Sequence, residues 1–136
     1  MKYVFFILLV LMVALSCGKP LTTPSLTATW FAYSQSINYL NVERMALDLR
    51  ADSTYRYYYR NAPIPPLEVG EDYTEGGRYH VRGDSLYFTV LETMGEKKTF
   101  EYARKFRLLP DTTEWPLRIN YFRKGTDFEV YFQPQE

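Results

Sequence analysis

Apolar and polar residues alternate along most of the chain after residue 26. The clearest case is the segment 44–50, in which Met45, Leu47 and Leu49 are separated mainly by charged residues. An alternation of period two predicts a strand with one buried face, whereas a helix repeats its apolar positions about every 3.6 residues. We therefore predict eight strands, at residues 26–35, 44–50, 54–60, 77–82, 85–91, 99–109 and 115–123, and around Phe128, Val130 and Phe132.

Short turns separate several of these predicted strands. Ala51-Asp52-Ser53 and Gly83-Asp84 each lie between two alternating segments, which predicts two hairpins. Two connections are longer, at residues 36–43 and 61–74, and the prolines of the second exclude a central strand because proline removes ladder donors. The pattern predicts an all-β fold, an antiparallel meander of about eight strands that forms a small barrel or a flattened barrel or sandwich.

The N-terminal segment has the pattern of an export signal. Lys2 precedes an uninterrupted apolar run, Val4–Leu15, of twelve residues. A membrane-spanning helix needs about 20 apolar residues, so this run is too short to span comfortably and we interpret residues 1–16 as a signal peptide. Its removal from the 136 residues leaves 120, which is enough for one domain with its own core.

The end of the apolar run, Val13-Ala14-Leu15-Ser16-Cys17, resembles the lipobox of bacterial lipoproteins. The resemblance implies cleavage before Cys17 and attachment of acyl chains, of the palmitate type, to that cysteine as a permanent membrane anchor. Residues 17–25 are then a lipidated tether, and the location is a bacterial cell envelope, lipid-anchored in the outer membrane and facing the periplasm. The alternative is an ordinary buried cysteine beside a cleaved signal or an uncleaved anchor helix.

Residues 26–136 resemble the lipocalin-like domains of small lipoproteins from Bacteroidetes-type bacteria. The resemblance rests on Trp30 in the first predicted strand, on the strand and turn at residues 47–55, and on the segment 76–86 that begins Gly76-Gly77. It implies a barrel-like domain in the cell envelope, and the family carries no catalytic residues to transfer.

The charge and cysteine content exclude one class of partner and one kind of cross-link. The chain has 16 basic and 16 acidic residues, and loss of Lys2 with the signal peptide leaves 15 basic residues. A domain so close to neutral is not attracted to nucleic acid by its net charge, so no nucleic-acid partner is predicted. Cys17 is the only cysteine, which excludes a disulfide within the monomer.

The sequence offers few candidate catalytic or zinc-binding residues. His80 is the only histidine, and Arg78 and Arg82 share its predicted strand face, which disfavours its protonation. No Gly-x-Ser-x-Gly motif supplies a nucleophile, and zinc requires three or four Cys, His or carboxylate ligands. We expect a surface or hydrogen-bonded histidine, and we predict neither an enzyme nor a cofactor.

An acidic cluster lies in and beside the second long connection, at Glu68, Glu71, Asp72 and Glu75. Oxygen ligands suffice for calcium, but the cluster lacks the spacing of an EF-hand. A solvated acidic loop is the favoured interpretation, and no metal site is predicted.

Aromatic residues are abundant, with 13 Tyr, 9 Phe and 2 Trp. The interior of an eight-stranded barrel is just wide enough to be filled by side chains or to hold one small ligand. The rings therefore form either a packed core or the wall of a pocket whose tyrosine hydroxyls bind the ligand. The predicted binding residues for a small apolar or amphipathic ligand are Trp30, Tyr55, Tyr57, Tyr59 and Tyr79.

Arginines occupy the opposite face of the same predicted strands. If the tyrosines point inward, a basic stripe that includes Arg44 and Arg50 points outward. Such a stripe would contact anionic headgroups or an acidic envelope protein, unless loop carboxylates simply balance it. The predicted interaction surface consists of Arg56, Arg60, Arg78 and Arg82.

Two functions follow from these observations. The first is a membrane-anchored envelope lipoprotein that binds a small apolar or amphipathic ligand inside its barrel. The alternative is a protein-protein or envelope-surface interaction module with a filled, ligand-free barrel.

Overall fold

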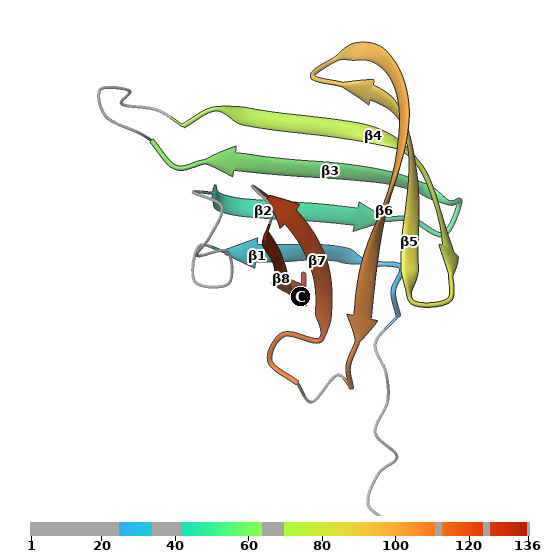
Figure 1. Cartoon of the computed structure of the whole chain (residues 1–136), viewed down its shortest axis with the longest axis vertical. Helices are drawn as coiled ribbons and strands as arrows, with labels where there is room; N and C mark the ends of the chain where they lie inside the picture. Colours follow the sequence, from blue (N-terminus) through green and yellow to red (C-terminus); the bar gives the residue numbers. More distant parts are fainter. Residues whose placement is uncertain (1–24, 34–41, 64–69, 111–112, 124–125, 136) are drawn as a thin grey trace, which may run out of the picture.

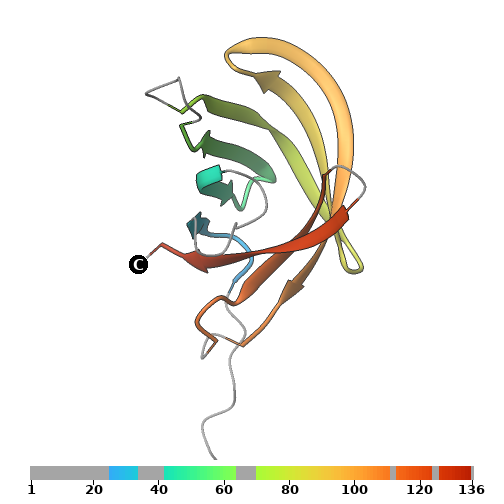
Figure 2. The same cartoon turned by 60° about the vertical axis from the view of Figure 1, so that its left-hand side comes forward.

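The chain folds into eight antiparallel strands that close into a barrel (Figures 1 and 2). The computed structural model describes residues 25–33, 42–63, 70–110, 113–123 and 126–135, and the proposed signal peptide and Cys17 lie outside them. The strands are β1 (Thr29–Tyr33), β2 (Val42–Leu49), β3 (Thr54–Asn61), β4 (Asp72–Arg82), β5 (Ser85–Thr93), β6 (Glu96–Leu108), β7 (Leu117–Arg123) and β8 (Thr126–Pro134).

Each strand pairs with the next along the chain, and β1 pairs with β8 to close the barrel. This arrangement confirms the predicted all-β meander of eight strands and fits a small lipocalin-like barrel. Across the described ranges the structure contains no helix, and hence none long and apolar enough to cross a membrane.

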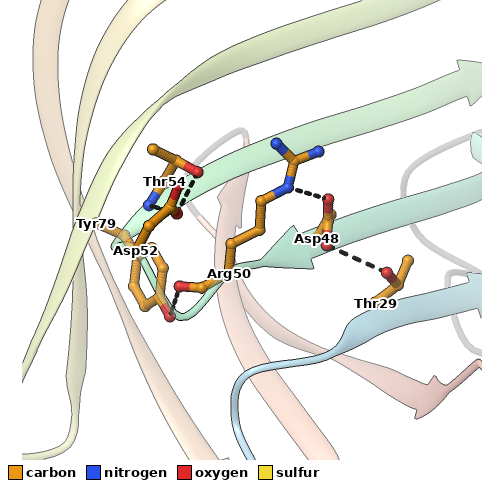
Figure 3. A network of polar contacts seen from close by, with 6 residues as sticks. All are labelled: Thr29, Asp48, Arg50, Asp52, Thr54 and Tyr79. Carbon is orange, nitrogen blue, oxygen red and sulfur yellow. Dashed lines mark hydrogen bonds and ion pairs between the residues drawn. The ribbon is translucent and has the colours of Figure 1, made fainter.

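Both predicted hairpin turns are present. At the β2–β3 turn the Thr54 amide donates to Oδ1 of Asp52 at 3.0 Å, and Ser53 has a φ of 65° (Figure 3). The β4–β5 turn has Gly83 at its first central position with a φ of 61°, the sign that a type II′ turn requires. The turn residues of the sequence therefore set these two registers.

Several predicted strand boundaries are wrong. β4 begins at Asp72, so the connection after β3 is shorter than predicted. Met94 and Gly95 form an unpredicted β5–β6 turn, with φ values of 53° and 80°. Residues 96–98 of β6, which precede the predicted strand, are exposed where the hairpin tip arches beyond the other strands, and they show no apolar alternation (Figure 2). Trp115 precedes β7, which begins at Leu117.

The hydrophobic core fills the half of the barrel where the chain enters β1, which we call the base. Trp30 is completely buried there, and its indole N–H donates to the carbonyl of Leu26 at 2.9 Å. Tyr55 is 2% exposed and packs edge-on against Phe88, with ring centroids 4.7 Å apart. The other fully buried large side chains are Leu49, Leu86, Val90, Leu117, Ile119, Val130 and Phe132.

The backbone ladders around the barrel are unequal. β2 and β3 pair at seven positions, whereas β6 and β7 pair at three and β1 and β8 at two. The β7–β8 hairpin nevertheless supplies four buried core residues, Leu117, Ile119, Val130 and Phe132. Side-chain burial therefore holds this hairpin in place more than backbone pairing does.

Candidate functional site

A cavity of about 580 Å³ occupies the end of the barrel opposite the base. We call this end the mouth, because β1, β3, β5 and β7 end there and the strands that follow them begin there. The volume lies within the range of roughly 300–1,000 Å³ typical of small-molecule sites. The residues that line this mouth cavity are Val42, Met45, Leu47, Tyr57, Tyr59, Asn61, Tyr73, Glu75, Phe88, Phe100, Tyr102, Arg104, Ile119 and Tyr121.

Tyrosines from β3 and β4 form one wall of the mouth cavity. The strand register places Tyr59 opposite Tyr73 and Tyr57 opposite Glu75, so all four side chains face the interior together. The rings of Tyr59 and Tyr73 stack with centroids 4.8 Å apart, and Tyr57 lies 5.8 Å from Tyr59. The wall therefore presents both aromatic faces and hydroxyl groups to an occupant.

Glu75 is a buried carboxylate in this wall, with 7% of its surface exposed. Three tyrosine hydroxyls donate to it: Tyr55 to Oε1 at 2.7 Å, Tyr73 to Oε2 at 2.8 Å, and Tyr102 to Oε1. A buried carboxylate is costly unless hydrogen bonds replace its water. Three charge-assisted bonds from rigid rings supply that replacement and fix the orientation of the carboxylate.

The environment keeps these phenols protonated. Burial, followed by the hydrogen bond to Glu75, raises the pKa of Tyr55, and burial with the nearby charge of Glu75 raises the pKa of Tyr102. Burial, followed by the hydrogen bond to Glu75, raises the pKa of Tyr73 to about 12. Each hydroxyl therefore remains a donor throughout the neutral range.

A second pair of tyrosines extends the wall toward β7. Burial raises the pKa of Tyr57, and its interaction with the Tyr121 hydroxyl raises that pKa further. Burial likewise raises the pKa of Tyr121 to about 12, although Arg104 acts in the opposite direction. The cavity thus contains neutral phenols close to both a carboxylate and a guanidinium.

Arg104 is the cationic side chain of the mouth cavity. It lies on β6, and its guanidinium carbon is 5.2 Å from the ring centroid of Tyr102 and 5.0 Å from that of Tyr121. These distances are typical of cation–π contacts. Its Nε is buried and has no hydrogen-bond partner among the described residues. Within the same part of the chain Arg104 forms no ion pair, including with Glu75.

The five predicted ligand-binding residues separate into two groups. Tyr57 and Tyr59 line the mouth cavity, and Tyr55 binds the carboxylate in its wall. Trp30 lies in the base, and Tyr79 donates its hydroxyl to the carbonyl of Arg50 at 3.0 Å beside the β2–β3 turn (Figure 3). The structure brings the three residues of β3 together at the site and leaves the other two outside it.

Sequence reasoning missed the two charged residues of the site. Glu75 was expected in a solvated acidic loop, but it lies inside the barrel because β4 starts before it, and its phase matches Tyr73. Arg104 interrupts an inward phase that includes Tyr102 and Phe106. A charged residue in an otherwise aromatic phase was the signal that could have identified both.

The other acidic residues of the predicted loop cluster do not join Glu75 in the cavity wall. Glu71 and Asp72 are exposed, and Glu68 falls outside the described residues. Across the ranges that the structure describes, no group of three or more His, Cys, Asp or Glu residues could hold a metal ion. The single histidine, His80, is exposed on β4 and stacks on Tyr87 with ring centroids 5.0 Å apart.

The predicted arginine surface is only partly neutralised. Arg60 binds Asp72 through two hydrogen bonds, of 2.6 and 3.0 Å, and this contact lowers the pKa of Asp72 to about 2. Arg56, Arg78 and Arg82 are exposed, and none of them has an ion pair within the described part of the chain. The surface therefore retains three arginines that a partner could contact.

No protein-family model matches this sequence, no curated protein resembles it significantly, and no solved structure matches its fold at a significant level.

Proposed function

We propose that this protein is a lipid-anchored lipoprotein of a bacterial cell envelope that binds a small amphipathic molecule in the mouth of its barrel. The observation that carries the proposal is the cavity of about 580 Å³ lined by tyrosines and apolar side chains. Cavities of this size with mostly apolar walls and a few polar groups are typical of small-molecule sites.

The division of the barrel interior favours binding over a purely structural interior. Core side chains pack together in the base, whereas a cavity of about 580 Å³ lies between the rings and apolar side chains at the mouth. Three of these rings are fixed by Glu75, so the wall is preorganised and an occupant would not have to order it. A filled, ligand-free barrel would not need such a wall.

The described chain begins at the base of the barrel, at the end opposite the mouth. The chain enters β1 at the base, and the eight residues between Cys17 and Leu26 reach at most about 26–29 Å when extended. Lipidation at Cys17 would thus hold the base toward the membrane, and the mouth would face the aqueous phase of the periplasm. A ligand would then reach the cavity from solution.

The anchor is tested with Cys17→Ala in the native bacterium. We expect the wild-type chain to stay in the membrane fraction after carbonate washing and to incorporate labelled palmitate, and we expect the variant to do neither. A variant that remains lipidated and membrane-bound would refute the anchor.

Binding is tested by mass spectrometry of the intact, full-length protein under non-denaturing conditions, followed by solvent extraction. We expect a co-purified small molecule that is lost in Asn61→Trp, which narrows the mouth cavity, and retained in Thr99→Trp, which lies on the exposed start of β6. If wild type carries no molecule and takes up none from an envelope lipid extract, the proposed binding function is refuted.

The arginine surface supports a second candidate, an interaction module. Arg56, Arg78 and Arg82 lack ion pairs within the described ranges, unlike Arg60. The double substitution Arg56→Glu and Arg78→Glu should abolish co-purification of an acidic envelope partner, whereas Lys98→Glu, on the β6 hairpin, should not. An unchanged set of partners would count against this candidate.

A further inference from the structure

We infer that the ligand of the mouth cavity carries a carboxylate, and that Arg104 is the residue that binds it. This inference rests on the proposed binding function and identifies the chemical class of the ligand. It begins from the only two charged side chains that line the cavity among the described residues, Glu75 and Arg104.

Glu75 has little capacity left for a ligand. A carboxylate has about four acceptor sites, and the hydroxyls of Tyr55, Tyr73 and Tyr102 occupy three of them. A cationic ligand would have to compete with three fixed donors on the same carboxylate. The anionic residue of the cavity is therefore already satisfied by the protein.

Arg104 is in the opposite situation. A guanidinium has five N–H donors, and the faces of Tyr102 and Tyr121 contact it without accepting a conventional hydrogen bond. Its buried Nε has no acceptor within the described part of the chain, and a buried donor without an acceptor costs stability. Because Arg104 lines the cavity and forms no ion pair in that part of the chain, an acceptor group on a ligand would meet no competing carboxylate at the guanidinium.

A planar carboxylate is the anionic group that best matches the guanidinium of Arg104. Two rings position the side chain across the β6–β7 junction, where it lines the cavity. Carboxylates match the fork of an arginine with two parallel hydrogen bonds, a geometry that lysine cannot supply. The remaining walls, which include Leu47, Phe88 and Ile119, are apolar and suit the body of an amphipathic acid.

Arg118 shows that location, and not the unpaired nitrogen alone, distinguishes Arg104. Arg118 on β7 lies 4.7 Å from the ring centroid of Tyr131, and its Nε is also buried without a partner among the described residues. It does not line the mouth cavity. Arg118 is therefore a matched control, an arginine that also has a buried, unpartnered Nε among the described residues and a ring contact, but that does not line the cavity.

The experiment compares carboxylate probes with neutral amides of the same shape. The full-length protein in a non-ionic detergent is titrated calorimetrically with 2-naphthoate and with its neutral isostere 2-naphthamide, with detergent blanks. Decanoate and decanamide form a second pair. Each titration is repeated for Arg104→Met, Arg104→Lys and Arg118→Met, and near-ultraviolet circular dichroism establishes that each variant is folded.

We expect wild type to bind each carboxylate roughly tenfold to hundredfold more tightly than its amide, the range given by a hydrogen-bonded charge pair. Arg104→Met should reduce this ratio to about one, Arg104→Lys should retain part of it because the charge remains, and Arg118→Met should preserve it. A ratio that survives in Arg104→Met, or that is near one in wild type, overturns the inference alone. Failure of wild type to bind either member of either pair also overturns the inference, whereas the proposed binding function is refuted only if the mass-spectrometric experiment detects no bound molecule.

Discussion

Alkaline pH should unfold this barrel within a narrow range. Burial raises the pKa of Tyr55, Tyr57, Tyr102 and Tyr121 in the folded protein, and Glu75 adds to the increase for Tyr55 and Tyr102. An unfolded tyrosine loses its proton near pH 10. The folded state then binds more protons than the unfolded state, so stability is fully present below about pH 10 and is lost as pH rises above it.

The size of the effect follows from these pKa values. At pH 11 each tyrosine that ionises only in the unfolded chain lowers the free energy of unfolding by about 1.4 kcal/mol. Four such residues together remove about 6 kcal/mol, which is comparable with the total stability of about 5–15 kcal/mol of a small domain. Tyr121, whose pKa is about 12, remains mostly protonated in the folded state at that pH.

The assay is urea unfolding followed by near-ultraviolet circular dichroism at several values between about pH 8 and 11, together with the absorbance of tyrosinate. The buried tyrosines should ionise only as the fold is lost. Tyr55→Phe should make the pH dependence shallower by about 1.4 kcal/mol per pH unit. Phe88→Leu, which removes a core ring without removing a phenol, should lower stability at every pH and leave the slope unchanged.

The reasoning is refuted if tyrosinate absorbance rises for all tyrosines near pH 10 while the urea midpoint and the near-ultraviolet spectrum stay constant. In that case the phenols of the mouth cavity would be accessible to solvent in the folded state. The carboxylate cluster would then not be the closed arrangement that the hydrogen bonds indicate.

Two further changes have expected outcomes. A Cβ added at Gly77 would lie 2.1 Å from the carbonyl oxygen of Thr89, so Gly77→Ala should destabilise the fold by about 1–3 kcal/mol in urea unfolding. A Cβ at Gly76 would make only ordinary contacts, so Gly76→Ala should cost less than about 1 kcal/mol. Equal losses of stability in the two variants would contradict this argument. Arg60→Met should raise the pKa of Asp72 from about 2 toward that of an ordinary aspartate in a carboxyl-carbon NMR titration, and an unchanged value would show that the ion pair is not its cause.

The strands could be predicted because most of them have one buried and one exposed face. β2 shows this most clearly, since its buried Met45, Leu47 and Leu49 are the residues whose alternation predicts the strand. The start of β6 could not be predicted in this way, because residues 96–98 are all exposed and their pairing with β5 depends on the Met94-Gly95 turn. Period-two patterns report burial and not backbone pairing.

The site was harder to predict than the fold for a related reason. Glu75 follows Glu71 and Asp72, so local composition gives all three the appearance of a loop, and only the register of β4 against β3 separates the buried carboxylate from the exposed ones. Its partner Tyr102 is 27 residues away on β6. A hydrogen-bond cluster assembled from three strands has no local sequence signature.

The β7–β8 hairpin closes the barrel with only five residue pairs at its two outer edges, although it supplies four buried core residues. This difference between backbone pairing and side-chain burial affects how the molecule unfolds. Burial of the hairpin's four core side chains contributes about 6–12 kcal/mol in gross terms, whereas each backbone hydrogen bond at these short edges contributes only about 0.5–1.5 kcal/mol. The hairpin cannot peel away while the core stays intact, because its release exposes the residues that hold the core together. Hydrogen exchange at its outer edges should consequently follow global unfolding, and a chain truncated before Leu117 should lack a folded state altogether.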